Sequence, residues 1–89
     1  MKEAAYRVRG KVQGVGFRWW TRSRARGLGL AGTVRNCPDG SVEVRVRGTE
    51  QVVAAFREQL ALGPPGSRVE EVEEVPTSPV DDESFEIIR

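Results

Sequence analysis

The sequence predicts an α+β fold whose elements follow the order strand-helix-strand-strand-helix-strand, with a short fifth strand at the end. Apolar residues alternate with charged ones over residues 5–12 and 41–47, which is typical of half-buried strands. Apolar residues recur at helical spacing over residues 17–28 and 50–62. Glycine and proline clusters separate these segments and indicate the connecting turns.

The first half of the chain contains a strand, a glycine-containing loop and a helix. In the strand over 5–12, every second residue is expected to point toward a core, and these residues are Tyr6, Val8, Gly10 and Val12. The helix over 17–28 ends before Gly29, a natural stop, and gathers four apolar residues near one face: Phe17, Trp20, Ala25 and Leu28. Because adjacent tryptophans cannot both face the core, we expect Trp20 to pack inside. Trp19 would then cap the loop or lie at the surface.

The second half begins with a hairpin and a second helix. Residues 30–36 and 41–47 are two strands joined by a turn at 38–40, where proline presets φ and glycine accepts a positive φ. Thr49 is placed to cap the helix over 50–62. Valines at every third position favour a fourth strand over 69–75, and residues 85–88 favour the short fifth strand. The acidic residues of the fourth strand read as a solvated face.

This order of elements is the ferredoxin-like βαββαβ arrangement. It places two helices on one face of an antiparallel sheet and forms a single core. The first crossover makes the strands over 5–12 and 30–36 parallel, so both end at the same edge of the sheet. Asn36, at the end of the second strand, is therefore expected beside the glycine loop and Arg18.

The loop itself has the composition of an anion site. Gly14 and Gly16 allow a sharp turn and close approach of backbone N–H groups, and the helix that follows adds its own unpaired N–H groups. Arg18 supplies a guanidinium that can hold two phosphate oxygens. The pattern is neither a dinucleotide fingerprint nor a P-loop. A plain strand-to-helix connection, with Arg18 solvated, explains the same residues.

Composition limits the chemistry further. The chain has 89 residues and a net charge of +1, but residues 1–40 carry +7 and residues 41–89 carry −6. A basic first half would attract a small anion. The chain has no histidine and a single cysteine, Cys37, so we expect neither a zinc site nor an internal disulfide. The absence of a signal-peptide core and of a long apolar run predicts a cytoplasmic protein that does not span a membrane.

Three segments resemble the signature segments of acylphosphatases: Lys-Val-Gln-Gly-Val-Gly-Phe-Arg over 11–18, Gly-Leu-Ala-Gly over 29–32, and the stretch 34–44 around Asn36. The resemblance covers the chain and implies one acylphosphatase-like domain over 1–89, which hydrolyses acyl phosphates without metal or cofactor. It implies that Arg18 binds the phosphate and Asn36 orients the attacking water. The implied phosphate-binding loop consists of Gln13, Gly14, Val15, Gly16, Phe17 and Arg18. Thr33 departs from the tryptophan frequent in the family, which affects packing rather than chemistry.

The residues fit such a reaction. Arg18 stays protonated and Asn36 is not basic, so the site suits a reaction that needs positioning and charge stabilisation more than proton transfer. An acyl phosphate qualifies because its carboxylate leaving group needs no proton. The expected substrate is therefore a small acyl phosphate, and inorganic phosphate or sulfate is the expected inhibitor. We expect the protein to be a monomer and to bind no specific nucleic acid.

Two other functions remain open from the sequence. Ferredoxin-like domains also bind RNA, and the exposed cations of the strands over 5–12 and 41–47 permit weak electrostatic binding. Those strands offer only Tyr6 as an aromatic platform for stacking bases. The second alternative is a regulatory or carbamoyl-phosphate-binding domain, because acylphosphatase-like domains also occur inside larger proteins.

Overall fold

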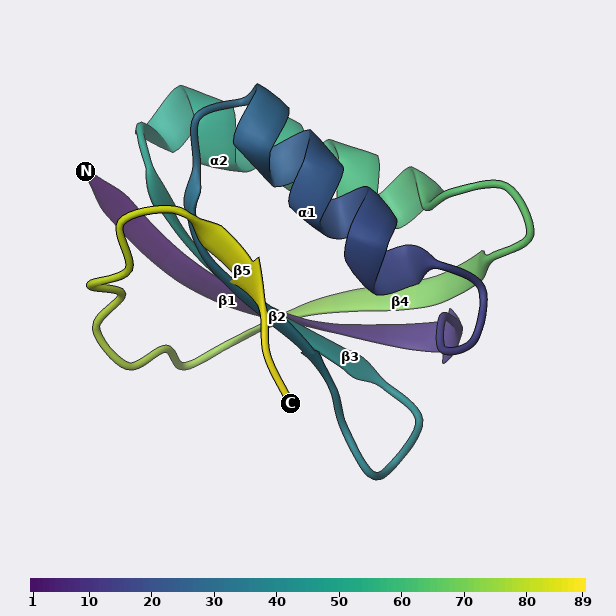
Figure 1. The fold of residues 1–89 in the computed structure, drawn as a ribbon. Coiled ribbons are helices and arrows are strands. Elements are labelled where there is room, and N and C mark those ends of the chain that lie inside the picture. The colour runs from purple at the N-terminus through teal and green to yellow at the C-terminus, as the bar shows by residue number, and fades with distance from the viewer.

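The computed structural model describes residues 1–89 and contains the elements in the expected order. Their bounds are β1 Lys2–Lys11, α1 Phe17–Gly27, β2 Ala31–Asn36, β3 Val42–Gly48, α2 Glu50–Leu62, β4 Arg68–Val75 and β5 Phe85–Ile87. Both helices lie on the same face of the sheet, as Figure 1 shows. The ferredoxin-like α+β fold is thus confirmed.

The sheet has five strands in the order β4-β1-β3-β2-β5. The first four pair antiparallel as expected, whereas β5 pairs parallel with β2, so the sheet is mixed rather than wholly antiparallel. Because β1 and β2 both run antiparallel to β3, they point the same way and end at the same edge (Figure 1). This edge carries both the glycine loop and Asn36.

The core lies between the sheet and the two helices. Fifteen buried apolar residues form it, including Tyr6 and Val8 from β1, the three valines of β3, and Phe56 of α2. Phe56 meets Phe85 edge-on, with ring centroids 6.1 Å apart, so the short β5 closes one side of the core. Thr49 caps α2 as predicted, since its hydroxyl accepts a hydrogen bond from the N–H of Val52.

The irregular valine spacing of β4 has a structural cause. The register between β1 and β4 shifts between Arg9 and Gly10, and the extra residue on β4 forms a bulge. Val69 and Val72, three residues apart, therefore both pack against the core. Val75 pairs with Ala5, a residue on the opposite face of β1. A bulge of this kind leaves no period-two pattern in the sequence.

The face of the sheet away from the helices is covered by charges and by the segment between β4 and β5. Arg45 and Arg47 donate hydrogen bonds to main-chain carbonyls of this segment, at Pro79, Val80 and Asp82. In return, the N–H of Val80 donates to Glu3. These contacts fix the long connection that brings β5 back beside β2. No helix of the protein is long and apolar enough to cross a bilayer.

Candidate functional site

The end of β2 and the beginning of α1 meet at one small cavity of about 140 Å³. Its lining residues are Val12, Gly14, Gly16, Phe17, Arg18, Trp19 and Asn36. Pockets for drug-sized ligands measure roughly 300–1,000 Å³, so this one suits a small ion or group. The two residues expected to act together, Arg18 and Asn36, thus reach the same cavity from different elements, although 18 positions separate them in the chain.

The loop between β1 and α1 exposes a continuous run of backbone donors. Gly14 and Gly16 have φ values of 75° and 76°, a left-handed conformation that favours glycine. The first hydrogen bond of α1 runs from the N–H of Trp20 to the carbonyl of Gly16, at 3.0 Å, and no side chain caps this end. The N–H groups from Gly14 to Trp19 therefore make no hydrogen bond within the protein. Such a nest at a helix N-terminus attracts anions.

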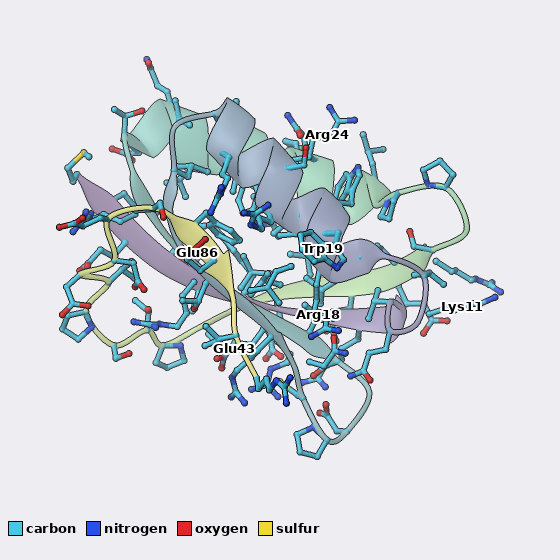
Figure 2. The ribbon with its side chains drawn as sticks, in the orientation of Figure 1. Lys11, Arg18, Trp19, Arg24, Glu43 and Glu86 are labelled. Carbon is cyan, nitrogen blue, oxygen red and sulfur yellow. The ribbon has the colours of Figure 1, made fainter.

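The two polar side chains of the cavity have no partners of their own. Arg18 takes part in none of the side-chain hydrogen bonds or ion pairs of the structure, and Figure 2 shows it beside Trp19 at the beginning of α1. The Oδ1 atom of Asn36 is buried without a hydrogen-bond partner. An unpaired buried oxygen is costly unless a ligand or water satisfies it. Both groups are thus available to a bound molecule.

Two residues of the expected phosphate loop, Gln13 and Val15, do not line the cavity. The Gln13 side chain instead donates two hydrogen bonds of 2.9 Å, to the carbonyls of Cys37 and Ser41. It therefore ties the loop to the turn between β2 and β3, and so holds Arg18 and Asn36 in register. Val15 packs against the hydrophobic core. The resemblance alone did not reveal these supporting contacts.

Residues 4–87 match the family model for acylphosphatases. The chain belongs to the acylphosphatase family. A Rhodospirillum rubrum acylphosphatase is 45% identical over 85 residues, covering 96% of this chain and 93% of that protein. The crystal structure of a Bacillus subtilis acylphosphatase superposes with a TM-score of 0.93 at 34% identity and covers 100% of both chains. The crystal structure of full-length HypF is also similar, with 26% identity and a TM-score of 0.80. That match covers 99% of this chain and 12% of the HypF chain.

Membership of the acylphosphatase family makes the protein an enzyme that hydrolyses acyl phosphates. The resemblance seen in the signature segments is thereby confirmed. The family match does not by itself assign the individual residues.

The charge of this acylphosphatase is distributed differently in space than along the chain. The acidic second half neutralises many cations of the first: Arg7 and Arg9 pair with carboxylates of β3 and β4, and Arg22 and Arg26 pair with Glu86 of β5. Arg18 is left unpaired at the cavity. Lys2, Lys11 and Arg24 of the first half also form no ion pair, but Arg18 is the only cation that lines the cavity, where it lies beside the unpaired N–H groups.

The turn after Asn36 is held by Asp39. This carboxylate accepts hydrogen bonds from the hydroxyl and the N–H of Ser41, at 2.5 and 3.0 Å. These bonds, assisted by Arg9 and Arg7, hold the pKa of Asp39 at about 2. Asp39 therefore stays ionised at neutral pH and stabilises the hairpin that carries Asn36.

Trp19 and Val12 also line the cavity, although neither belongs to the expected set. Val12 is fully buried and forms part of the floor by packing. Trp19 is 65% exposed, whereas Trp20 packs against Phe17 with ring centroids 5.6 Å apart. The expectation that only Trp20 packs inside is confirmed. The adjacency of two tryptophans to Arg18 was the signal that could have placed Trp19 at the site.

Proposed function

We propose that the enzyme holds the phosphate of an acyl phosphate in this cavity, between Arg18 and the backbone N–H groups from Gly14 to Trp19. The observation that carries the proposal is that Arg18 and the unpaired oxygen of Asn36 line one small cavity together with most of the loop and helix residues whose N–H groups make no hydrogen bond within the protein. A doubly charged phosphate would satisfy the N–H groups and the guanidinium together.

Asn36 then orients the attacking water. Its buried Oδ1 can accept a hydrogen bond from a water molecule and point the water's lone pair at phosphorus. The water oxygen forms a bond to phosphorus while the bond from phosphorus to the acyl oxygen breaks. The carboxylate leaves with that electron pair, and the water's proton passes to a phosphate oxygen. Arg18 and the N–H groups stabilise the charge on the equatorial oxygens.

This mechanism uses no metal ion. The guanidinium and the helix N-terminus occupy the positions at which a cation would otherwise neutralise phosphate charge, and a cation beside Arg18 would be repelled. No group of three or more histidine, cysteine or acidic side chains is arranged so that it could hold a metal ion. Inorganic phosphate and sulfate are accordingly expected to compete with substrate for the same donors.

A nucleic-acid function has less support. Arg7 and Arg9 are paired with carboxylates, and Arg45 and Arg47 are bound to the segment that precedes β5. Four of the five strand cations that favoured electrostatic binding are therefore already paired or covered, and Lys11 is the one left exposed. The match to part of HypF keeps a regulatory or carbamoyl-phosphate-binding domain of a larger protein as the second candidate. Activity of this chain by itself distinguishes that role from free hydrolysis.

The test is phosphate release from benzoyl phosphate, with p-nitrophenyl phosphate as a simple-ester control. Arg18→Ala and Arg18→Lys should both lose nearly all activity while staying folded, because an ammonium group cannot reproduce the two-pronged contact of a guanidinium. Arg24→Lys is the matched control, since Figure 2 shows Arg24 on the outer side of the same helix, pointing away from Arg18. Near-wild-type kcat/KM for a folded Arg18→Lys enzyme would contradict the assignment.

A further inference from the structure

We propose that Trp19 recognises the acyl group of the substrate and gives the enzyme a preference for flat, aromatic acyl phosphates. The proposal rests on the phosphate site described above, and it adds a substrate class to that site. Trp19 would act by contact with the part of the substrate that does not enter the phosphate cavity.

The size and polarity of the cavity place the acyl group outside it. The polar part of this space of about 140 Å³ consists of Arg18 and the loop N–H groups, which match a phosphate, and of Asn36, which matches the attacking water; the buried Val12 and Phe17 complete the wall beside Trp19. The acyl carboxylate must also leave after the bond breaks, so it belongs on the open side. Trp19 lines this same cavity and is 65% exposed, so its indole extends from the cavity wall into solvent.

Packing of the protein does not explain this side chain. Trp19 does not belong to the hydrophobic core, whereas its neighbour Trp20 packs against that core. The other large apolar residues that are exposed, Met1, Leu62 and Ile88, line no part of the phosphate cavity. Ligand pockets combine aromatic side chains with a few polar groups, so an exposed indole at the rim of a polar cavity is suited to contact a ligand.

The indole is also held in place. The guanidinium carbon of Arg22 lies 5.4 Å from the centroid of the Trp19 ring, which is a cation–π contact. Arg22 itself approaches Glu86 of β5, with the Arg22 Nε and Glu86 Oε1 atoms 3.9 Å apart. One face of the ring is therefore covered by an anchored arginine, and a flat group can stack on the other. A side chain fixed in advance loses little conformational entropy when it binds.

The experiment compares acetyl, benzoyl and 2-naphthoyl phosphate, which share the reacting bond and differ in aromatic surface. In the wild-type enzyme KM should fall along this series. Trp19→Ala should raise KM for benzoyl phosphate by about 2- to 12-fold, the factor that an aromatic pair contributes. KM for acetyl phosphate and the inhibition constant of inorganic phosphate should change less than about 2-fold, because they do not use the ring. Trp19→Phe should restore most of the preference.

A second measurement separates binding from turnover. Phenacylphosphonate and acetonylphosphonate replace the bridging oxygen of benzoyl and acetyl phosphate by a methylene group, so they bind without being hydrolysed. The wild-type enzyme should bind the phenacyl compound more tightly, and Trp19→Ala should remove that difference. Leu62→Ala is the matched control, because Leu62 is 80% exposed and lies away from the phosphate cavity.

Each outcome decides one of the two proposals. An equal loss for acetyl and benzoyl phosphate in Trp19→Ala would mean that the residue only supports the loop, and unchanged constants would mean that it touches no substrate. Either result overturns the role of Trp19 and leaves the phosphate site intact. Full activity of Arg18→Ala on all three substrates would instead overturn the phosphate site itself.

Discussion

A methyl group at Gly16 should impair phosphate binding far more than it impairs folding. Gly16 has φ 76°, and a Cβ built there meets no protein atom within 4 Å. Gly29, at the other end of α1, has φ 73° and equally open surroundings, but does not line the phosphate cavity. Gly16→Ala and Gly29→Ala therefore impose the same backbone strain at two ends of one helix. Only one of them alters the proposed site.

The structure sets the size of the effect on stability. With no steric contact, the cost is that of placing a non-glycine residue in the left-handed region, about 1–2 kcal/mol. For a domain of this size such a loss lowers Tm by roughly 4–16 °C, and it leaves most molecules folded because small domains have about 5–15 kcal/mol of stability. Gly32 shows the opposite case, since a Cβ there would stand 1.8 Å from the carbonyl oxygen of Arg45. Gly32→Ala should not fold normally.

The assay combines a thermal melt with calorimetric titration of inorganic phosphate and kcat on benzoyl phosphate. Both Gly16→Ala and Gly29→Ala should melt earlier by similar amounts. Gly16→Ala should also bind phosphate at least about 10-fold more weakly, the factor that corresponds to 1.4 kcal/mol, whereas Gly29→Ala should bind it normally. If the two variants kept the same phosphate affinity and the same kcat, the loop would be a simple connector and the cradle would be wrong.

Three further predictions concern the phosphate site and the turn beside it. Asn36→Ala should lower kcat by about 10²–10³-fold, the usual effect of removing one preorganised polar group from a transition state, with little change in phosphate affinity; equal losses in both would make Asn36 a binding residue. Chelators should leave activity unchanged and sulfate should inhibit competitively, so restoration of a chelated enzyme by Mg²⁺ would refute the metal-free mechanism. The pKa of Asp39 is lowered from 3.8 to about 2, so the stability it contributes is present above pH 3.8 and is lost as the pH falls toward 2. Asp39→Asn should flatten the acid limb of the stability profile over this interval, and an unchanged acid limb would show that its hydrogen bonds to Ser41 contribute nothing.

The elements with strong local patterns were predictable from the sequence. The alternation of β3 and the turn before it are local properties, and both appear in the structure as expected. The pairing of β5 was not predictable, because its three residues carry no pattern that distinguishes a parallel neighbour from an antiparallel one. Likewise, the bulge opposite Gly10 depends on how two strands meet, which no single segment encodes.

The proximity of Arg18 and Asn36 was predictable because it follows from topology. Once β1 and β2 are parallel, their ends must share an edge, whatever the side chains are. The role of Gln13 was not predictable in this way. Its amide reaches carbonyls 24 and 28 residues away, and a side-chain contact across two loops leaves no trace in spacing or hydropathy. The position of Trp19 was ambiguous for the same reason. Helical periodicity indicates on which face of the helix Trp19 lies, but not which residues of the loop or of β2 lie near that face.

The distribution of ion pairs explains why so many arginines produce a selective site. If every cation of the first half were free, phosphate would be attracted to much of the surface. In the structure, Arg9 contacts three carboxylates: Glu71 and Glu73 from the second half of the chain, and Asp39 from the turn at the end of the first half. Folding thus pairs the two oppositely charged halves and leaves Arg18 without a carboxylate. Among the cations without a carboxylate, Arg18 is the one that lines the cavity beside unpaired N–H groups, so the proposed anion site also includes Asn36.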